Sequence, residues 1–208
     1  KKMSFRIEDK LYIKTENLID FKDFLNKNSA KKMHEPRTIK SLYFDNLNLD
    51  MYNDSIEGLV PRKKIRIREY PFGKDKNFYL EVKNSAVEGR YKTRKIINKK
   101  SFDNYKKIGI FDNQYGVCFP NFYVTYERDY LIIDDVRISI DKNLVYENYK
   151  SSGIYKDNNS IVEIKTSIKK NLDELIKLFP FQRIRFSKYC FAVDSLSNRT
   201  TNWSGLNY

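Results

Sequence analysis

The chain has 208 residues and a formal net charge of +13, from 40 Lys and Arg against 27 Asp and Glu. Hydrophobic residues make up 40%, which excludes a chain kept disordered by charge of one sign, and seven glycines with five prolines exclude collagen-like and linker-like sequences. No linker or repeat divides the chain, so we expect one domain over residues 1–208. Its apolar runs are too short for a transmembrane segment, and its two cysteines fit a reducing compartment, so we expect a cytoplasmic protein.

Helical spacing of apolar residues occurs in only a few segments. Thr15–Asn28 and Asn171–Phe179 each begin with a residue that can cap a helix and carry one apolar stripe. Shorter helices are predicted at Leu47–Ser55 and Ser101–Lys107. The two longer helices have the form expected of helices that cover one face of a sheet.

Most of the remaining sequence alternates between apolar and polar residues, which is the period of a β-strand. Helices are too rare between the strands for parallel crossovers, so we expect antiparallel pairing and an α+β fold. The eight predicted strands are Ser4–Lys14, Thr38–Phe44, Lys64–Tyr70, Asn77–Lys83, Gly89–Ile97, Phe122–Leu131, Val136–Asp141 and Ser160–Thr166.

One face of these strands is ionic. Within Lys64–Tyr70, Arg66 and Arg68 alternate with isoleucines, and in the next predicted strand Glu81 and Lys83 share a face. The ionic face carries ten bases and four acids, a net charge of +6: Lys10, Arg66, Arg68, Lys83, Lys92, Arg94, Arg128, Arg137, Lys165 and Lys188, with Glu8, Glu81, Asp141 and Glu163.

A flat sheet with one solvated face would also alternate. However, so much like charge on one surface favours a site for an anion. We therefore expect an eight-stranded antiparallel tunnel, closed as a barrel, with a polar basic lumen and a few helices covering its apolar outside.

The mixture of charges indicates the chemistry of the ligand. Arginine and lysine bind phosphate oxygens, whereas carboxylates bind Mg²⁺ or Mn²⁺, which share their remaining positions with phosphates and water. The chain has no P-loop motif, and its one histidine, His34, does not favour a histidine base or a zinc site. The sequence thus predicts a site for a metal-bound polyphosphate, where positioning and charge neutralisation suffice for phosphoryl transfer.

Nine motifs, in order along the chain, resemble the VTC domain, the polyphosphate polymerase module of the triphosphate tunnel metalloenzyme (CYTH-like) superfamily. They are Glu8-x-Lys10; Ser41-Leu42-Tyr43-Phe44-Asp45 with Tyr52; Lys64-Ile65-Arg66-Ile67-Arg68-x-Tyr70; Leu80-Glu81-Val82-Lys83; Lys92-x-Arg94; Tyr126-x-Arg128; Arg137-x-Ser139-x-Asp141; Glu163-Ile164-Lys165; and Phe186-Ser187-Lys188-Tyr189. The aromatic residues Tyr43, Phe44 and Tyr52 are expected to pack on the apolar side. The first motif is shorter than the Glu-x-Glu-x-Lys of the wider superfamily.

The resemblance implies a role for each ionic residue. The catalytic set would be Arg66, Arg68, Lys83, Arg128, Arg137 and Lys188. The phosphate-binding set would be Lys10, Lys92, Arg94, Tyr126, Lys165 and Ser187. The ligand of Mn²⁺ or Mg²⁺ would be Glu163, with Glu8 and Glu81 as further candidates.

The implied reaction transfers the γ-phosphoryl group of ATP to a growing inorganic polyphosphate chain. The alternatives are a triphosphatase or polyphosphate hydrolase in the same tunnel, and a non-catalytic domain that binds polyphosphate or inositol phosphates. The expected partners are ATP and polyphosphate and not nucleic acid, with membrane association only through partner proteins.

Overall fold

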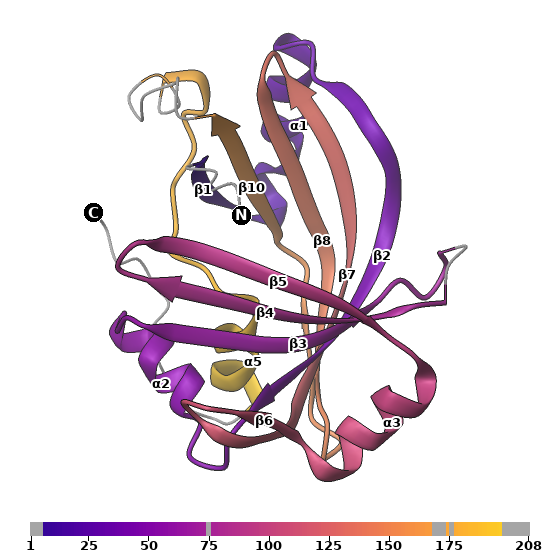
Figure 1. Ribbon diagram of the computed structural model, residues 1–208. Coiled ribbons are helices and arrows are strands. Elements are labelled where there is room, and N and C mark those ends of the chain that lie inside the picture. The colour runs from indigo at the N-terminus through magenta and orange to yellow at the C-terminus, as the bar shows by residue number, and fades with distance from the viewer. Residues whose placement is uncertain (1–5, 74–75, 168–173, 175–176, 197–208) are drawn as a thin grey trace.

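The computed structural model describes residues 6–73, 76–167, 174 and 177–196. Its main feature is a strongly curved antiparallel sheet (Figure 1). The strands are β1 (Arg6–Ile13), β2 (Lys31–Asp45), β3 (Arg62–Glu69), β4 (Phe78–Ala86), β5 (Gly89–Ile97), β6 (Ile110–Asp112), β7 (Gly116–Ile133), β8 (Val136–Asn148), β9 (Ile154–Asp157) and β10 (Ser160–Ser167). The helices are α1 (Leu18–Lys27), preceded by the 3₁₀ turn η1 (Thr15–Asn17), α2 (Asp50–Glu57), α3 (Lys99–Ile108) and α5 (Lys188–Leu196).

Hydrogen bonds join the strands in the order β1-β10-β8-β7-β2-β3-β4-β5, while β6 pairs with β7 and β9 with β8. Every pair is antiparallel, as predicted. The eight predicted strands are all present, but β2, β7 and β8 are longer than predicted and the short β6 and β9 were missed. The long strands form one wall of a curved structure, and the β3–β4–β5 meander folds across it.

The predicted closure into a barrel is not confirmed. β1 and β5 stand at the two ends of the pairing order, and no pairing joins them in the described part of the chain. The free edge of β1 meets another segment, because the Ile184 amide donates to the Lys10 carbonyl at 2.9 Å and Leu11 bridges Arg183. The ends of the sheet still approach each other: Lys83 Nζ on β4 lies 3.8 Å from Glu8 Oε1 on β1. The sheet therefore encloses a cavity without closing.

Two helices cover the apolar outer face: α1, which was predicted to do so, and α3, which was predicted only as a short helix. Phe21 and Leu25 of α1 are buried against β1, β8 and β10, and Phe102 of α3 is buried against the β2–β5 region. Each such aromatic or aliphatic side chain contributes roughly 1.5–3 kcal/mol by burial. The predicted helix Asn171–Phe179 falls largely outside the described residues, although Phe179 is buried in the α1 cluster. None of the described helices has the length and apolar content needed to cross a membrane.

Helix α5 was not predicted, and it lies inside the curve of the sheet, between the β3–β5 layer and the β7–β8 wall (Figure 1). On β8, Asn143 adopts a positive φ of 53° where the register with β7 shifts, so Asp141 and Leu144 both face inward. The inner face is therefore ionic at one end and apolar at the other. Helix α5 fills the apolar end, in a cluster that includes Val124, Leu144, Tyr146, Tyr189 and Val193.

Asp45, the last residue of β2, holds α2 and α5 to the sheet. Its carboxylate accepts hydrogen bonds from the amides of Met51 and Tyr52 in α2 at 3.1 and 3.0 Å, and from the Tyr189 hydroxyl of α5 at 2.6 Å. Tyr52 also bonds to Asp194 of α5. These bonds fix the first turn of α5 through Tyr189 and its last turn through Asp194, and the first turn borders the ionic part of the cavity.

Candidate functional site

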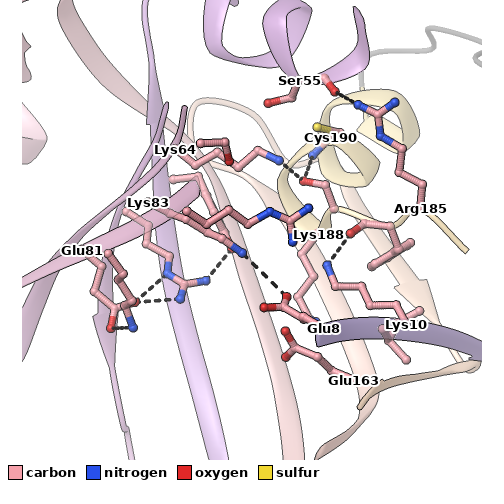
Figure 2. A pocket seen from close by; sticks show the side chains of 18 of the residues that line it. Glu8, Lys10, Ser55, Lys64, Glu81, Lys83, Glu163, Arg185, Lys188 and Cys190 are labelled. Carbon is pink, nitrogen blue, oxygen red and sulfur yellow. Dashed lines mark hydrogen bonds and ion pairs between the residues drawn. The ribbon is translucent and has the colours of Figure 1, made fainter. Parts of the chain in front are cut away.

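The concave side of the sheet encloses a cavity of about 580 Å³ (Figure 2). Thirteen lysines and arginines line it against four carboxylates, an excess of nine positive charges. The bases are Lys10, Arg62, Lys63, Lys64, Arg66, Arg68, Lys83, Arg90, Lys92, Arg128, Lys165, Arg185 and Lys188, and the acids are Glu8, Asp9, Glu81 and Glu163. Like charge at this density raises the energy of the folded chain unless an anion neutralises it, so the cavity favours a polyanionic ligand.

Most of the residues predicted for the site line this cavity. They are Glu8, Lys10, Arg66, Arg68, Glu81, Lys83, Lys92, Tyr126, Arg128, Glu163, Lys165, Ser187 and Lys188. Arg94 and Arg137 do not belong to the lining. The Arg94 guanidinium lies 3.7 Å from the Tyr79 ring, and Arg137 is exposed on β8. Strand alternation thus identified the correct face of β8 but not the point along it where the cavity ends.

Tyr43 is buried in a core cluster, as predicted, but the predicted face was wrong. It was expected on the apolar side, but its hydroxyl accepts a hydrogen bond from Arg66 NH1 at 2.9 Å inside the cavity. Burial raises the pKa of Tyr43, but Arg66 and Arg68 outweigh burial and lower it. Its neighbours Leu42 and Phe44 are buried on the opposite face of β2. Their alternation with Tyr43 was the signal that could have placed it correctly.

Five further bases were not predicted for the site. Lys63 forms an ion pair with Asp112 at 2.9 Å. Lys64 continues the alternation of β3 into the cavity and donates to Ser187 Oγ at 2.8 Å. Arg62 lies where β3 begins, Arg90 lies beside the β4–β5 turn, and Arg185 precedes α5. The last three occupy segment ends and a connection, where no strand period reveals which way a side chain points.

Glu81 of β4 is the counter-ion of several bases. Its Oε2 lies 2.7 Å from Arg66 NH2 and its Oε1 lies 2.6 Å from Lys92 Nζ, with Arg94 and Arg68 at 3.7 and 3.9 Å. Burial raises the pKa of Glu81, but Arg66, Arg68 and Lys92 outweigh burial and lower it to about 2. This carboxylate holds the guanidinium groups in position, so its oxygens are already engaged by cations.

Glu8 and Glu163 form a carboxylate pair of a different kind. Register pairs Glu8 with Lys165 and Glu163 with Lys10, so the two glutamates are diagonal neighbours on the cavity face of β1 and β10. Burial, and next a hydrogen bond with Glu163, raise the pKa of Glu8. The pKa of Glu163 is lowered well below its usual value by the Glu8 hydrogen bond and by Lys165, against the effect of burial. Two carboxylates placed in this way favour a proton or a cation between them.

The donor set of this carboxylate pair fits Mg²⁺ or Mn²⁺. These cations take oxygen ligands, and Mg²⁺ in particular is commonly held by one or two carboxylates together with phosphate oxygens and water. Among the residues that the structure describes, no group of three or more His, Cys, Asp and Glu gathers to hold a metal. Glu8 and Glu163 would therefore share the ion with a phosphate ligand.

Asp141 organises a second pair of bases. Arg128 binds it through Nε and NH2 at 2.5 and 2.7 Å, and Lys188 Nζ lies 2.5 Å from Oδ2. Burial raises the pKa of Asp141, but Lys188 and Arg128 outweigh burial and lower it. Lys188 and Arg128 also lie 4.7 and 5.4 Å from the centre of the Tyr126 ring. The two cations are held side by side, as recognition of a phosphate requires.

Two lysines of the cavity are withdrawn from water. Burial lowers the pKa of Lys10 to about 8, an effect that Glu163 opposes, and the Lys10 Nζ donates to the Phe186 carbonyl at 2.6 Å. Burial also lowers the pKa of Lys64. An anionic ligand would favour the charged form of both amines, so binding and protonation are coupled here.

Several solved structures have the same fold as this chain. The chain shares its fold with three solved structures of low sequence identity, and this similarity concerns the fold alone. A candidate adenylate cyclase from Bacillus halodurans has a TM-score of 0.61 at 13% identity, covering 89% of this chain and 95% of its own. A candidate adenylate cyclase from Vibrio parahaemolyticus has 0.53 at 13% identity (90% and 97% covered), and a conserved hypothetical protein from Pyrococcus furiosus has 0.50 at 19% (86% and 92%).

The family to which the chain belongs is a more specific identification than its fold. A family model described as the VTC domain matches residues 5–197, and the chain belongs to this family. The resemblance to the VTC domain inferred from the nine motifs is thereby confirmed. No curated protein matches the sequence significantly.

Proposed function

We propose that this chain is a metal-dependent polyphosphate polymerase that transfers the γ-phosphoryl group of ATP to inorganic polyphosphate. The observation that carries the proposal is the combination, in one cavity, of thirteen bases with the adjacent carboxylates of Glu8 and Glu163. Bases alone would suit any polyanion. The carboxylate pair adds a place for a cation that accompanies phosphates, which supports a site for phosphoryl transfer.

The residues of the chain have separate tasks in this proposal. Arg66 and Arg68, held by Glu81, bind phosphate oxygens from the β3–β4 side, and Arg128 and Lys188, held by Asp141, bind them from the other side. Five further lining bases, Lys10, Lys64, Lys83, Lys92 and Lys165, neutralise the charge of the chain of phosphates. A Mg²⁺ or Mn²⁺ ion held by Glu8 and Glu163 would neutralise charge on the phosphates beside it.

The reaction needs no nucleophile from the protein. A terminal phosphate oxygen of the polyphosphate forms a bond to the γ-phosphorus of ATP, and the bond from that phosphorus to the β–γ bridging oxygen breaks. ADP leaves with the bridging oxygen and its electron pair, and the polymer gains one phosphate. The bases supply positioning and stabilise the charge on the transferring group, which are the main requirements of phosphoryl transfer.

The experiment is incubation of the 208-residue chain with ATP and either Mn²⁺ or Mg²⁺. The expected products are long phosphate polymer, seen on a urea gel, and one ADP molecule for each phosphate incorporated. Orthophosphate without polymer would replace the proposal with a triphosphatase. Tight binding of polyphosphate with no product of either kind would replace it with a non-catalytic binding domain.

A further inference from the structure

Three apolar side chains are exposed at one end of the molecule, where α3 meets the hairpin of β6 and β7 (Figure 1). Phe111 on β6 is 72% exposed, Ile108 at the end of α3 is 62% exposed, and Val117 on β7 is 44% exposed. Phe111 and Val117 are cross-strand partners. Gly109, which follows Ile108, packs so closely on Val117 that an added Cβ would lie 2.7 Å from its side chain. The three residues, called the apolar tip below, therefore lie next to one another.

Lysines stand beside the apolar tip on the outer side of α3. This helix carries four lysines and one aspartate, a net charge of +3. Lys106 is ion-paired with Asp103 at 2.8 Å. Lys100 and Lys107 are exposed, line an open groove on α3, and have no ion pair among the described residues. Two helical turns separate Lys100 from Lys107 and Ile108, so these side chains lie on one side of the helix. The surface thus combines apolar groups with cations that lack a counter-ion.

The fold does not account for this surface. The opposite side of α3 makes the contacts with the sheet, through the buried Phe102, and Lys99 and Lys106 lie 5.6 and 4.7 Å from the centre of its ring. In the part of the chain that the structure describes, the lining of the basic cavity includes neither Lys100 nor Lys107, nor any residue of the apolar tip. Exposed apolar side chains with polar residues around them typically mark an interaction surface.

The composition of the surface favours a lipid membrane as the partner. Interfaces between proteins are depleted of lysine, whereas lysine is the cation that accompanies inserted apolar side chains at a membrane surface. There the apolar groups enter the boundary between headgroups and acyl chains, and the ammonium groups extend to anionic headgroups. A second copy of this chain is disfavoured, because two such surfaces would bring like charges together. A soluble polyanion would leave the apolar tip in water.

We propose that α3 and the β6–β7 hairpin form a docking surface for a membrane that contains anionic lipids. The apolar tip enters the interface of the bilayer, and Lys100 and Lys107 bind the headgroups. The contact is direct, whereas the sequence led us to expect membrane association only through partner proteins. Because the surface is separate from the cavity, the proposal does not depend on the proposed function.

The test is flotation of the 208-residue chain with vesicles of phosphatidylcholine alone or of phosphatidylcholine mixed with an equal amount of anionic phosphatidylglycerol. Tripolyphosphate is present throughout to occupy the basic cavity. We expect binding to the mixed vesicles only, and we expect salt to weaken it because salt screens exposed charges. Equal binding to both vesicles, or binding to neither, would overturn the proposal.

The first variant tests the apolar tip without changing the charge. Phe111→Ser removes one inserted side chain and should weaken binding to the mixed vesicles about tenfold or more. Ile19→Ser is the matched control, because Ile19 is 71% exposed on α1, at the opposite end of the molecule (Figure 1). This control should bind like the unmodified chain. Unchanged binding by Phe111→Ser would overturn the insertion of the tip.

The second variant tests the lysines. Lys100→Glu with Lys107→Glu should weaken binding about 100-fold or more, because each charge near an anionic membrane contributes to attraction. Lys22→Glu with Lys27→Glu on α1 makes the same change in net charge and should have a much smaller effect. Equal losses in the two pairs would show only the general attraction of a basic protein, and would overturn the docking surface.

Sedimentation of the unmodified chain and of Phe111→Ser completes the test. We expect both to have the same oligomeric state. A dimer that dissociates in Phe111→Ser would assign the apolar tip to a second copy of the chain and overturn the proposal. Because no turnover is measured, a chain that fails to polymerise phosphate can still show membrane docking, and a polymerase that does not bind the vesicles would refute the docking surface alone.

Discussion

The Glu81 region and the Glu8–Glu163 region of the cavity show two different uses of a carboxylate in a basic environment. Glu81 is enclosed by Arg66, Lys92 and two further arginines, and they lower its pKa to about 2. Glu163 is also paired with a base, because Lys165 Nζ lies 3.1 Å from its Oε1, but its other neighbour is Glu8, whose pKa is raised by burial and by the hydrogen bond between the two carboxyl groups. The difference teaches that residue type alone does not assign a role: a carboxylate enclosed by cations fixes those cations, whereas two carboxyl groups that share a hydrogen bond can exchange its proton for a metal cation.

The largest effect is expected at Glu163. Glu163→Gln removes one carboxylate of the pair and should reduce metal-dependent phosphoryl transfer by about 100-fold or more, the usual size for loss of a preorganised electrostatic group. Turnover of ATP at saturating Mn²⁺ measures the effect. Glu127→Gln is the matched control, because Glu127 is exposed on β7 and outside the cavity. Unchanged turnover in Glu163→Gln would remove the distinction between the two regions.

At Glu81 we expect an effect on stability. Because its folded pKa of about 2 lies below the usual 4.5, its ionised form stabilises the fold fully above pH 4.5, and this contribution is lost as the pH falls towards 2. Glu81→Gln should lower the free energy of unfolding at pH 7 by about 3 kcal/mol at most and flatten its acid dependence below pH 4.5. Urea unfolding between pH 2 and 7 measures both.

Added tripolyphosphate tests whether Glu81 neutralises the bases around it. Without its carboxylate, Arg66 and its neighbours lack a counter-ion, so added tripolyphosphate should raise the melting temperature of Glu81→Gln by more than it raises that of the unmodified chain. An equal rise in the two proteins would show that Glu81 does not neutralise these bases.

For Glu8→Gln we expect weaker metal binding without a loss of stability. Its raised pKa shows that the fold favours the neutral form, so Glu8→Gln should leave the melting temperature unchanged or slightly higher. The same variant should bind Mn²⁺ about tenfold more weakly in the presence of tripolyphosphate, measured by the loss of the free-ion EPR signal. A large fall in melting temperature with unchanged Mn²⁺ affinity would place Glu8 in the same class as Glu81.

The smallest effect is expected behind the Glu81 region, where Tyr189 stacks on Tyr43 with ring centres 5.4 Å apart. Tyr189→Phe removes the hydrogen bond to buried Asp45 and should cost about 1–3 kcal/mol of stability. Tyr146→Phe is the matched control, because the buried Tyr146 hydroxyl has no hydrogen-bond partner among the described residues and its loss should cost almost nothing. Equal costs would show that the Asp45 bond contributes no stability.

The two-residue period of the strands was sufficient to predict many of the residues that line the site. Alternation with buried isoleucines placed Arg66 and Arg68 on one face of β3, and the same period placed Glu163 and Lys165 on one face of β10. Because successive side chains of a strand point to opposite sides, the ionic face is a local property that needs no knowledge of which strands pair. The order of the motifs along the chain was likewise sufficient to indicate the family.

The extent of the cavity was decided by tertiary structure. Arg137 lies on the predicted face and remains outside, whereas Arg90 and Arg185, from a strand end and a connection, line the cavity. Their positions depend on how far the sheet bends and on which segment reaches the edge of β1, and these follow from contacts between residues far apart in the sequence. The same is true of α5, which occupies the inner face because the positive φ of Asn143 turns Leu144 inward. Local sequence thus determined which face is charged, and long-range packing determined how much of that face a ligand can reach.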